Sequence, residues 1–143
     1  MKKSILIGLL FCFCHAMFAQ LTSTGNEHKI DSLLSLINNE QKDTNQVNIL
    51  NEIGFEYSIL NFPKAKIYLN KAEKLARKLN FKRGIANSLC NLGIAYETQG
   101  DYFQALNAKI LALKIREEIR DKSGISYSIH YIGDVYFGQS DLS

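Results

Sequence analysis

This 143-residue chain has three features whose residue types and spacing could support chemistry. They are a histidine–aspartate pair, a pair of adjacent glutamates and one thiol. His130 and Asp134 are four residues apart. On a helix they would share a face, where the carboxylate could orient the imidazole as a general base or both could ligate a metal. The neighbouring sequence offers no third ligand for a metal and no nucleophile for a general base to activate. We therefore predict no catalytic, metal or cofactor site, and expect that the chain is not an enzyme.

The remaining candidates are weaker. Glu117 and Glu118 are adjacent, so on a helix they diverge and do not share a substrate. Cys90 could be a reactive thiol, but a small, half-buried residue is the favoured interpretation. The sequence has no glycine-rich phosphate-binding loop and no Ser, His and Asp constellation.

The first nineteen residues have the layout of a secretory signal peptide. Lys2 and Lys3 precede an apolar run over residues 5–14, which small residues follow. Cleavage could follow Ala19 or Ala16. An uncleaved anchor is the alternative, although the run is short for a membrane span of about 20 residues. We expect an exported, periplasmic chain.

Loss of the signal peptide would leave Cys90 as the only cysteine, so no internal disulfide is expected. It would also remove Lys2 and Lys3 and lower the formal charge from +3 to +1, which argues against a nucleic-acid partner. Residues 64–83 nevertheless hold eight Lys or Arg residues and one acid, Glu73. This stretch is either a solvated helix face or a contact for an anionic partner or membrane surface.

The elements that position these residues are given by an internal repeat. Gly54, Gly93 and Gly133 are separated by 39 and 40 residues. An apolar residue lies four residues before each glycine, and a tyrosine lies three residues after it. On a helix, this spacing places all three residues on one face. These companions are Leu50, Leu89 and Ile129, and then Tyr57, Tyr96 and Tyr136. The repeat unit is thus about forty residues long.

Each unit is predicted to be two helices joined by a polar turn, "QGD" in one copy and "LNFP" in another. Asp101 is a predicted N-cap, and Pro63 suits a first helical turn because it has no N–H to leave unpaired. The second helices are expected over about residues 63–79 and 102–120. A joint one residue shorter in the first copy accounts for the spacing of 39.

A glycine inside a helix costs roughly 0.5 to 1 kcal/mol relative to alanine, so its recurrence needs a compensating gain. We predict that the three glycines allow a partner helix to approach closely, with Ala65 and Ala105 as the facing residues. The tyrosines are expected to lie over this interface as core residues.

The pattern resembles the tetratricopeptide repeat (TPR). One copy carries six of the family's signature positions: Leu89, Leu92, Gly93, Tyr96, Ala105 and Ala112. The resemblance implies an all-α fold, a right-handed α-solenoid of antiparallel helix pairs over residues 44–143 with an incomplete last repeat. A lead-in over residues 20–43 would hold one short helix. Lys109 departs from the pattern because it stands where the family usually has a large apolar residue, and the long period implies longer helices.

The resemblance also implies that the first helices of the pairs line a concave groove for a peptide or a partner domain. Carried over position by position, the groove would include Asn48, Asn51, Phe55, Asn87, Asn91, Ile94, Tyr127, His130 and Asp134. The alternative is that these are merely exposed helix positions. Where some relatives place lysines and an asparagine to grip a terminal carboxylate, this chain has Asn51, Cys90 and Phe55, so that mode is not expected.

We therefore expect a non-catalytic protein-interaction scaffold. The alternative is the sensory input domain of a signal-transduction receptor, such as a histidine kinase, cyclase or regulator, whose output module is missing from this chain. The sequence ends where the second helix of the third pair would begin, which favours a fragment of a longer parent. Membrane association is expected only through a downstream segment absent from this chain.

Overall fold

The computed structural model describes residues 25–37 and 42–140. The chain divides into two compact units, Met1–Ser32 and Leu33–Ser143, and the repeats belong to the second. Residues 25–36 are helical. The predicted signal peptide, residues 1–19, lies outside the described residues. Among the helices that the structure describes, none is both long and apolar enough to cross a membrane.

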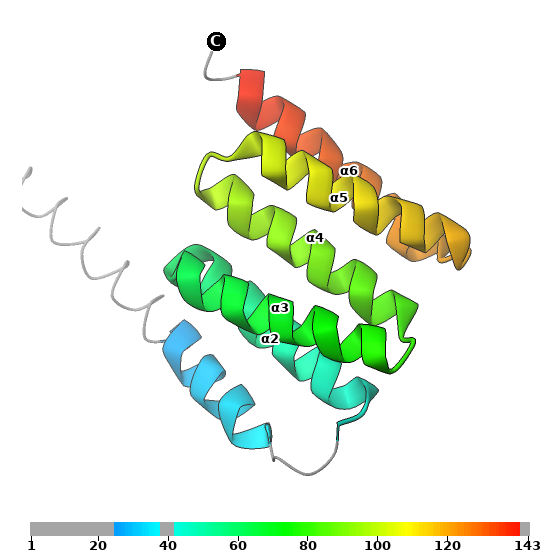
Figure 1. The fold of residues 1–143 in the computed structure, drawn as a ribbon. Helices are drawn as coiled ribbons and strands as arrows, with labels where there is room; N and C mark the ends of the chain where they lie inside the picture. Colours follow the sequence, from blue (N-terminus) through cyan, green and yellow to red (C-terminus); the bar gives the residue numbers. More distant parts are fainter. Residues whose placement is uncertain (1–24, 38–41, 141–143) are drawn as a thin grey trace, which may run out of the picture. The chain divides into compact units, whose positions relative to one another are not determined.

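From residue 42 to residue 140 the chain forms consecutive helices and no strand (Figure 1). In chain order they are α2 (Thr44–Leu60), α3 (Phe62–Lys78), α4 (Lys82–Thr98), α5 (Tyr102–Glu118) and α6 (Lys122–Ser140). Each helix packs on the next, and α2 also contacts α4, so the first helices of the first two pairs touch. The predicted all-α helical-repeat fold is confirmed.

The starts of two of these helices agree with the residues that the sequence singled out, Asp101 as a cap and Pro63 in a first turn. Asp101 accepts a hydrogen bond from the Gln104 amide at 3.1 Å, which confirms it as an N-cap. Asn61 caps α3 through the Lys64 amide, and Pro63 lies in the first turn. Asn61 is the whole joint between α2 and α3, whereas residues 99–101 join α4 to α5, so the first repeat is shorter at this joint.

Gly54 and Gly93 lie in close contacts between paired helices, as predicted, but the nearest atoms belong to Leu69 and Lys109. A Cβ at Gly54 would lie 2.5 Å from the Leu69 side chain, and one at Gly93 would lie 2.7 Å from Cγ of Lys109. Leu69 and Lys109 are equivalent residues forty positions apart. Each glycine thus leaves room for a long side chain of the second helix. Ala105 faces Gly93 through its carbonyl oxygen, but Ala65 is not among the closest contacts of Gly54.

The third copy does not follow this pattern. A Cβ at Gly133 would have no neighbour within 4 Å, and Ile129 and Tyr136 are 58% and 57% exposed. Leu50 and Leu89, the equivalents of Ile129, are buried, and Tyr57 and Tyr96, the equivalents of Tyr136, are partly buried. The prediction that Gly133 packs against a facing helix is therefore wrong for this chain, because no described helix covers that face of α6 as α5 covers α4.

Lys109 is fully buried, although it occupies an apolar position of the repeat. Its stem lies against Gly93, and its amine forms an ion pair with Glu97 and donates a hydrogen bond to the Tyr131 carbonyl at 2.9 Å. The Tyr131 ring lies 5.2 Å from the same amine, at cation–π distance. The long side chain replaces a leucine for packing and carries its charge to polar partners on α4 and α6.

Candidate partner-binding groove

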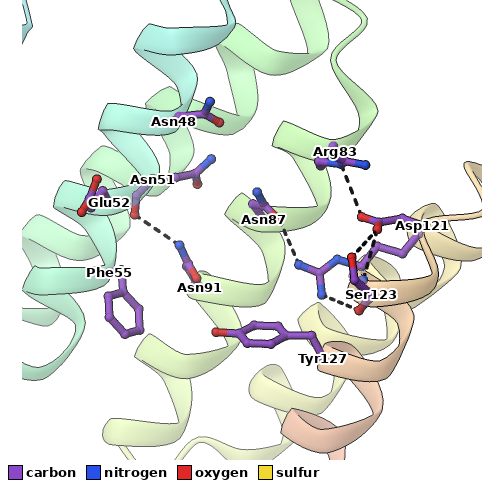
Figure 2. Close-up of a pocket in the computed structure, with 12 residues that line it drawn as sticks. Asn48, Asn51, Glu52, Phe55, Arg83, Asn87, Asn91, Asp121, Ser123 and Tyr127 are labelled. Carbon is purple, nitrogen blue, oxygen red and sulfur yellow. Dashed lines mark hydrogen bonds and ion pairs between the residues drawn. The ribbon is translucent and has the colours of Figure 1, made fainter.

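A cavity of ≈ 600 Å³ lies along the first helices of the pairs (Figure 2). We call it the amide groove, because four asparagines line it. Its lining residues are Asn48, Asn51, Glu52 and Phe55 of α2, Arg83, Asn87 and Asn91 of α4, Arg116 of α5, Asp121 of the following turn, and Ser123, Gly124 and Tyr127 of α6. The cavity thus draws on three successive first helices.

The structure brings together six of the nine groove residues predicted from sequence, namely Asn48, Asn51, Phe55, Asn87, Asn91 and Tyr127. The other three, Ile94, His130 and Asp134, do not line this cavity. The last residue of each first helix that lines the cavity is Phe55 in α2, Asn91 in α4 and Tyr127 in α6. These residues lie progressively earlier relative to the repeat glycine, so the groove runs obliquely across the helices. Positions further along α4 and α6 lie beyond it.

His130 and Asp134 form a surface pair. Nε2 of His130 is 3.6 Å from Oδ2 of Asp134, and the two side chains are 73% and 46% exposed. Within the residues that the structure describes, no group of three or more His, Cys, Asp or Glu residues could hold a metal ion. The pair therefore offers no enclosed site for a substrate or an ion.

Two asparagines are fixed by the backbone of neighbouring helices and keep part of their hydrogen-bonding capacity. Asn91 Nδ2 donates to the Asn51 carbonyl at 3.2 Å, which links α4 to α2 (Figure 2). Asn51 Nδ2 donates to the Gly84 carbonyl at 3.4 Å. Asn51 is only 5% exposed, and its Oδ1 accepts no hydrogen bond in the described structure. This buried oxygen is not exposed to the groove, whereas Asn91 keeps its Oδ1 as an acceptor because only its Nδ2 is bonded.

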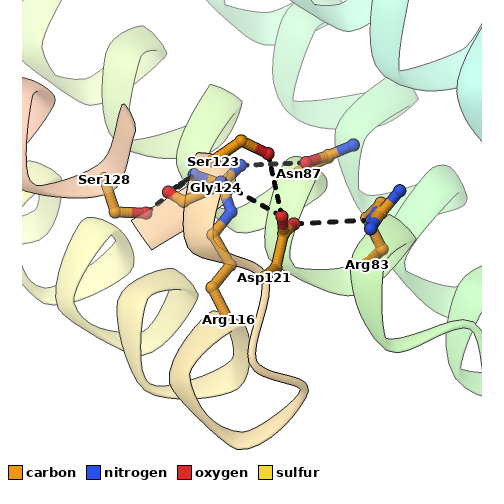
Figure 3. A network of polar contacts seen from close by, with 7 residues as sticks. All are labelled: Arg83, Asn87, Arg116, Asp121, Ser123, Gly124 and Ser128. Atoms are coloured by element: carbon orange, nitrogen blue, oxygen red, sulfur yellow. Dashed lines mark hydrogen bonds and ion pairs between the residues drawn. The ribbon is translucent and has the colours of Figure 1, made fainter. Parts of the chain in front are cut away.

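Arg116 organises the other end of the amide groove (Figure 3). Its buried guanidinium donates to the Gly124 carbonyl at 2.9 Å, to Ser128 Oγ at 2.7 Å and to Asn87 Oδ1 at 2.9 Å. The last bond fixes the Asn87 amide, so its Nδ2 remains as a donor. Nε of Arg116 is buried and has no hydrogen-bond partner in the described structure. The guanidinium thus ties α4, α5 and α6 together beneath the groove.

Asp121 caps α6 and contributes negative charge beside Arg116. Its Oδ1 accepts from the Gly124 amide at 3.1 Å and from the Ser123 hydroxyl at 3.0 Å. The Gly124 amide lowers the pKa of this carboxyl below its usual value, and Ser123 and the Arg83 guanidinium, 3.4 Å away, act in the same direction. Asp121 is therefore ionised when it pairs with Arg83.

Six lining residues were not predicted from the sequence, namely Glu52, Arg83, Arg116, Asp121, Ser123 and Gly124. Arg116 lies on a second helix, which the repeat pattern assigns to the outer layer, and its role depends on contacts with both α4 and α6. Asp121 had a detectable signal, because an Asp just before a helical run is a typical N-cap. Its place at the cavity could not be read from that signal.

Aromatic and thiol groups complete the site. Phe55 and Tyr127 are 41% and 47% exposed, so each offers an accessible ring. The Tyr127 hydroxyl lies 2.9 Å from that of Tyr131, and this hydrogen bond raises the pKa of Tyr131 well above its usual value. Cys90 is buried, and burial raises the pKa of its thiol although Arg116 and Lys109 lie nearby. A protonated, buried thiol is a packing residue.

Residues 20–141 match a family model described as the SusR N-terminal TPR domain. A search of the curated proteins found no match to the chain. The family match confirms the TPR resemblance and includes the lead-in residues before α2. TPR domains are generally non-catalytic repeat scaffolds that mediate protein–protein interactions.

Proposed function

Because the chain belongs to the family of the SusR N-terminal TPR domain, we propose that it is a non-catalytic scaffold whose amide groove binds a peptide or an extended segment of a partner domain. The coarse role, a protein–protein interaction scaffold, follows from the family. The groove as the site of binding is our proposal.

The hydrogen-bonding capacity of the groove asparagines carries this proposal. Asn91 has its amide nitrogen bonded to the Asn51 carbonyl and its oxygen available as an acceptor, and Asn87 has its oxygen engaged by Arg116 and its amide nitrogen available as a donor. An extended chain presents alternating N–H and C=O groups along its edge. Side chains that offer both acceptors and donors from fixed positions are therefore complementary to a peptide backbone.

The exposed rings supply the apolar part of the site. Phe55 and Tyr127 belong to different first helices and line the same cavity (Figure 2). Aromatic residues in such positions commonly dominate binding energy at interfaces. Arg83 and Asp121 balance each other at the groove edge, which favours a peptide without strong net charge.

The experiment is a selection of random linear peptides against the purified chain, followed by affinity measurements. Phe55→Ala should weaken the selected peptides by about 1 kcal/mol or more, because an aromatic contact is lost. Phe103→Ala is the matched control, since Phe103 is 71% exposed on α5 and does not line the groove. Equal affinity of both variants for the peptides would contradict the proposal.

A sensory input domain is the second candidate. The matching family is described as an N-terminal domain, which is the position of an input module ahead of other sequence. In such a protein, occupancy of the amide groove would bias an output carried elsewhere in the chain. The test is to introduce Phe55→Ala into a longer protein that carries this domain together with an output module. If the output of the variant responds to the stimulus as strongly as that of the parent, the groove is not the input site.

Export to the periplasm is proposed from the first nineteen residues alone. The basic, apolar and small-residue segments occur in the order of a signal peptide. Mass spectrometry of the mature protein should find Gln20 or Met17 at its N-terminus. A cytoplasmic chain that retains Met1 would contradict export.

A further inference from the structure

A second cavity, of ≈ 510 Å³, lies within the unit that spans residues 33–143 and shares no lining residue with the amide groove. Four apolar residues contribute to its wall: Leu34, Ile37, Leu50 and Leu75. They come from the chain just before α2, from α2 and from α3. Only Leu50 of these is buried, so the others leave apolar surface accessible in the cavity.

Four lysines line the same cavity, Lys42, Lys71, Lys74 and Lys78, and no Asp or Glu is among its described lining residues. We call this site the lysine cleft. Lys71, Lys74 and Lys78 are spaced by three and four residues on α3, so they share one helical face. Like charges at this spacing repel each other, and a bound anion would relieve that repulsion.

The structure separates these lysines from the rest of the basic stretch at residues 64–83. Three of the other basic residues pair with acids: Arg77 with Glu73, Lys82 with Glu118 and Arg83 with Asp121. Lys64 and Lys66 lie over the rings of Tyr57 and Tyr96. Lys71, Lys74 and Lys78 have no acidic partner in the described structure, although Lys71 lies 5.3 Å from the centre of the Tyr68 ring. Of the five basic residues in this stretch that have no acidic partner in the described structure, three thus line one cavity.

We propose that the lysine cleft binds a small amphiphile with an apolar tail and a carboxylate head group. Its volume is within the range of about 300 to 1,000 Å³ typical of small-molecule sites. The tail would cover the leucine and isoleucine side chains, and the head group would lie among the lysines.

The test is calorimetric titration of the full chain with dodecanoate, below the concentration at which it forms micelles. Dodecyltrimethylammonium has the same tail with the opposite charge, and butanoate has the head group with little tail. The proposal predicts that dodecanoate binds more tightly than either comparator and that added salt weakens its binding, because exposed charges are screened.

A matched pair of triple variants locates the site. Lys71→Gln, Lys74→Gln and Lys78→Gln together should weaken dodecanoate binding by about tenfold, since each exposed ion pair contributes modestly. Lys64→Gln, Lys66→Gln and Lys114→Gln remove the same charge from residues outside the cleft and should leave binding unchanged. If the first variant does not fold, the head-group comparison on the unaltered chain still decides.

Three outcomes would overturn the proposal. The first is equal binding of dodecanoate and dodecyltrimethylammonium, which indicates unspecific association of the tail. The second is equal loss in the two triple variants, which indicates a general charge effect. The third is binding of an acidic peptide to the lysines while dodecanoate does not bind, which would assign the cleft to a protein partner.

Discussion

Lys109 shows at the level of one residue how this chain combines packing with charge. The equivalent Leu69 and Lys109 both lie against a glycine of the first helix, but only the lysine reaches polar groups, on Glu97 and Tyr131. A buried ion pair of this kind is weak evidence of added stability, because desolvation opposes the attraction. Removal of one partner is nevertheless costly, since the other charge is then left without compensation.

We predict that Lys109→Met destabilises the fold by about 1 to 3 kcal/mol. Glu97 would lose its partner, but its side chain is 25% exposed, so water would compensate it in part. The double variant Lys109→Met, Glu97→Gln should recover most of this loss, because no unpaired charge remains. Urea unfolding of the parent, both single variants and the double variant measures the coupling. Additive effects of the two changes would refute it.

A pH dependence is expected from Asp121. The Gly124 amide lowers its pKa in the folded state, so the carboxylate stabilises the fold above its unfolded pKa of about 3.9. This contribution is lost as the pH falls through the lower folded-state pKa. Asp121→Asn keeps an oxygen for the cap but removes the charge. Its unfolding free energy should therefore fall less steeply than that of the parent below about pH 4. Parallel curves for the two proteins would show that Asp121 does not contribute.

At the scale of helices, the recurring glycine has two different environments. Gly93 faces Lys109 and the Ala105 carbonyl oxygen, whereas a Cβ at Gly133 meets nothing within 4 Å. The same residue in the same register is thus needed for close packing in α4 and not in α6. This difference gives a matched pair of substitutions within one protein.

Gly93→Ala should destabilise the fold by about 1 to 3 kcal/mol, because the added methyl group overpacks the contact between α4 and α5. Gly133→Ala should stabilise α6 by about 0.5 to 1 kcal/mol through helix propensity. Thermal unfolding followed by circular dichroism measures both. Stabilisation by both substitutions would show that Gly93 is not a close-packed position.

Much of the helical arrangement was predictable, because it depends on periodic residues. The forty-residue spacing of glycines and tyrosines predicted the helix pairs, and Asp101 predicted a helix start that the structure confirms. The contact partner of Gly54 was predicted wrongly, since spacing alone does not tell which residue of the facing helix enters the gap. The structure has Leu69 there and not Ala65.

The groove was predictable only in part, because spacing along the chain does not tell which residues of neighbouring helices lie together. Equivalent positions of successive first helices were assumed to contribute alike, but the cavity runs obliquely and leaves out Ile94, His130 and Asp134. Arg116 and Asp121 line it through contacts that join three helices and a turn, which no local pattern encodes. The sequence thus identified six of the lining residues on the first helices, and it missed residues whose place at the cavity depends on contacts between helices.

At the scale of the whole molecule, the amide groove and the lysine cleft of the second unit differ in character. The amide groove has balanced charge and hydrogen-bonding side chains, and the lysine cleft has an excess of positive charge over an apolar wall. Their lining residues do not overlap, so the two proposed sites can be tested separately. Changes in the lysine cleft should leave peptide selection at the amide groove intact.

The most direct test of the central claim is photo-crosslinking of a selected peptide to the chain, with the attachment sites mapped by mass spectrometry. A peptide in the amide groove should attach to the first helices, in α2, α4 and the start of α6, near Phe55, Asn91 and Tyr127. Attachment confined to α3 and to the outer residues of α5, such as Phe103, would contradict a binding site in the amide groove.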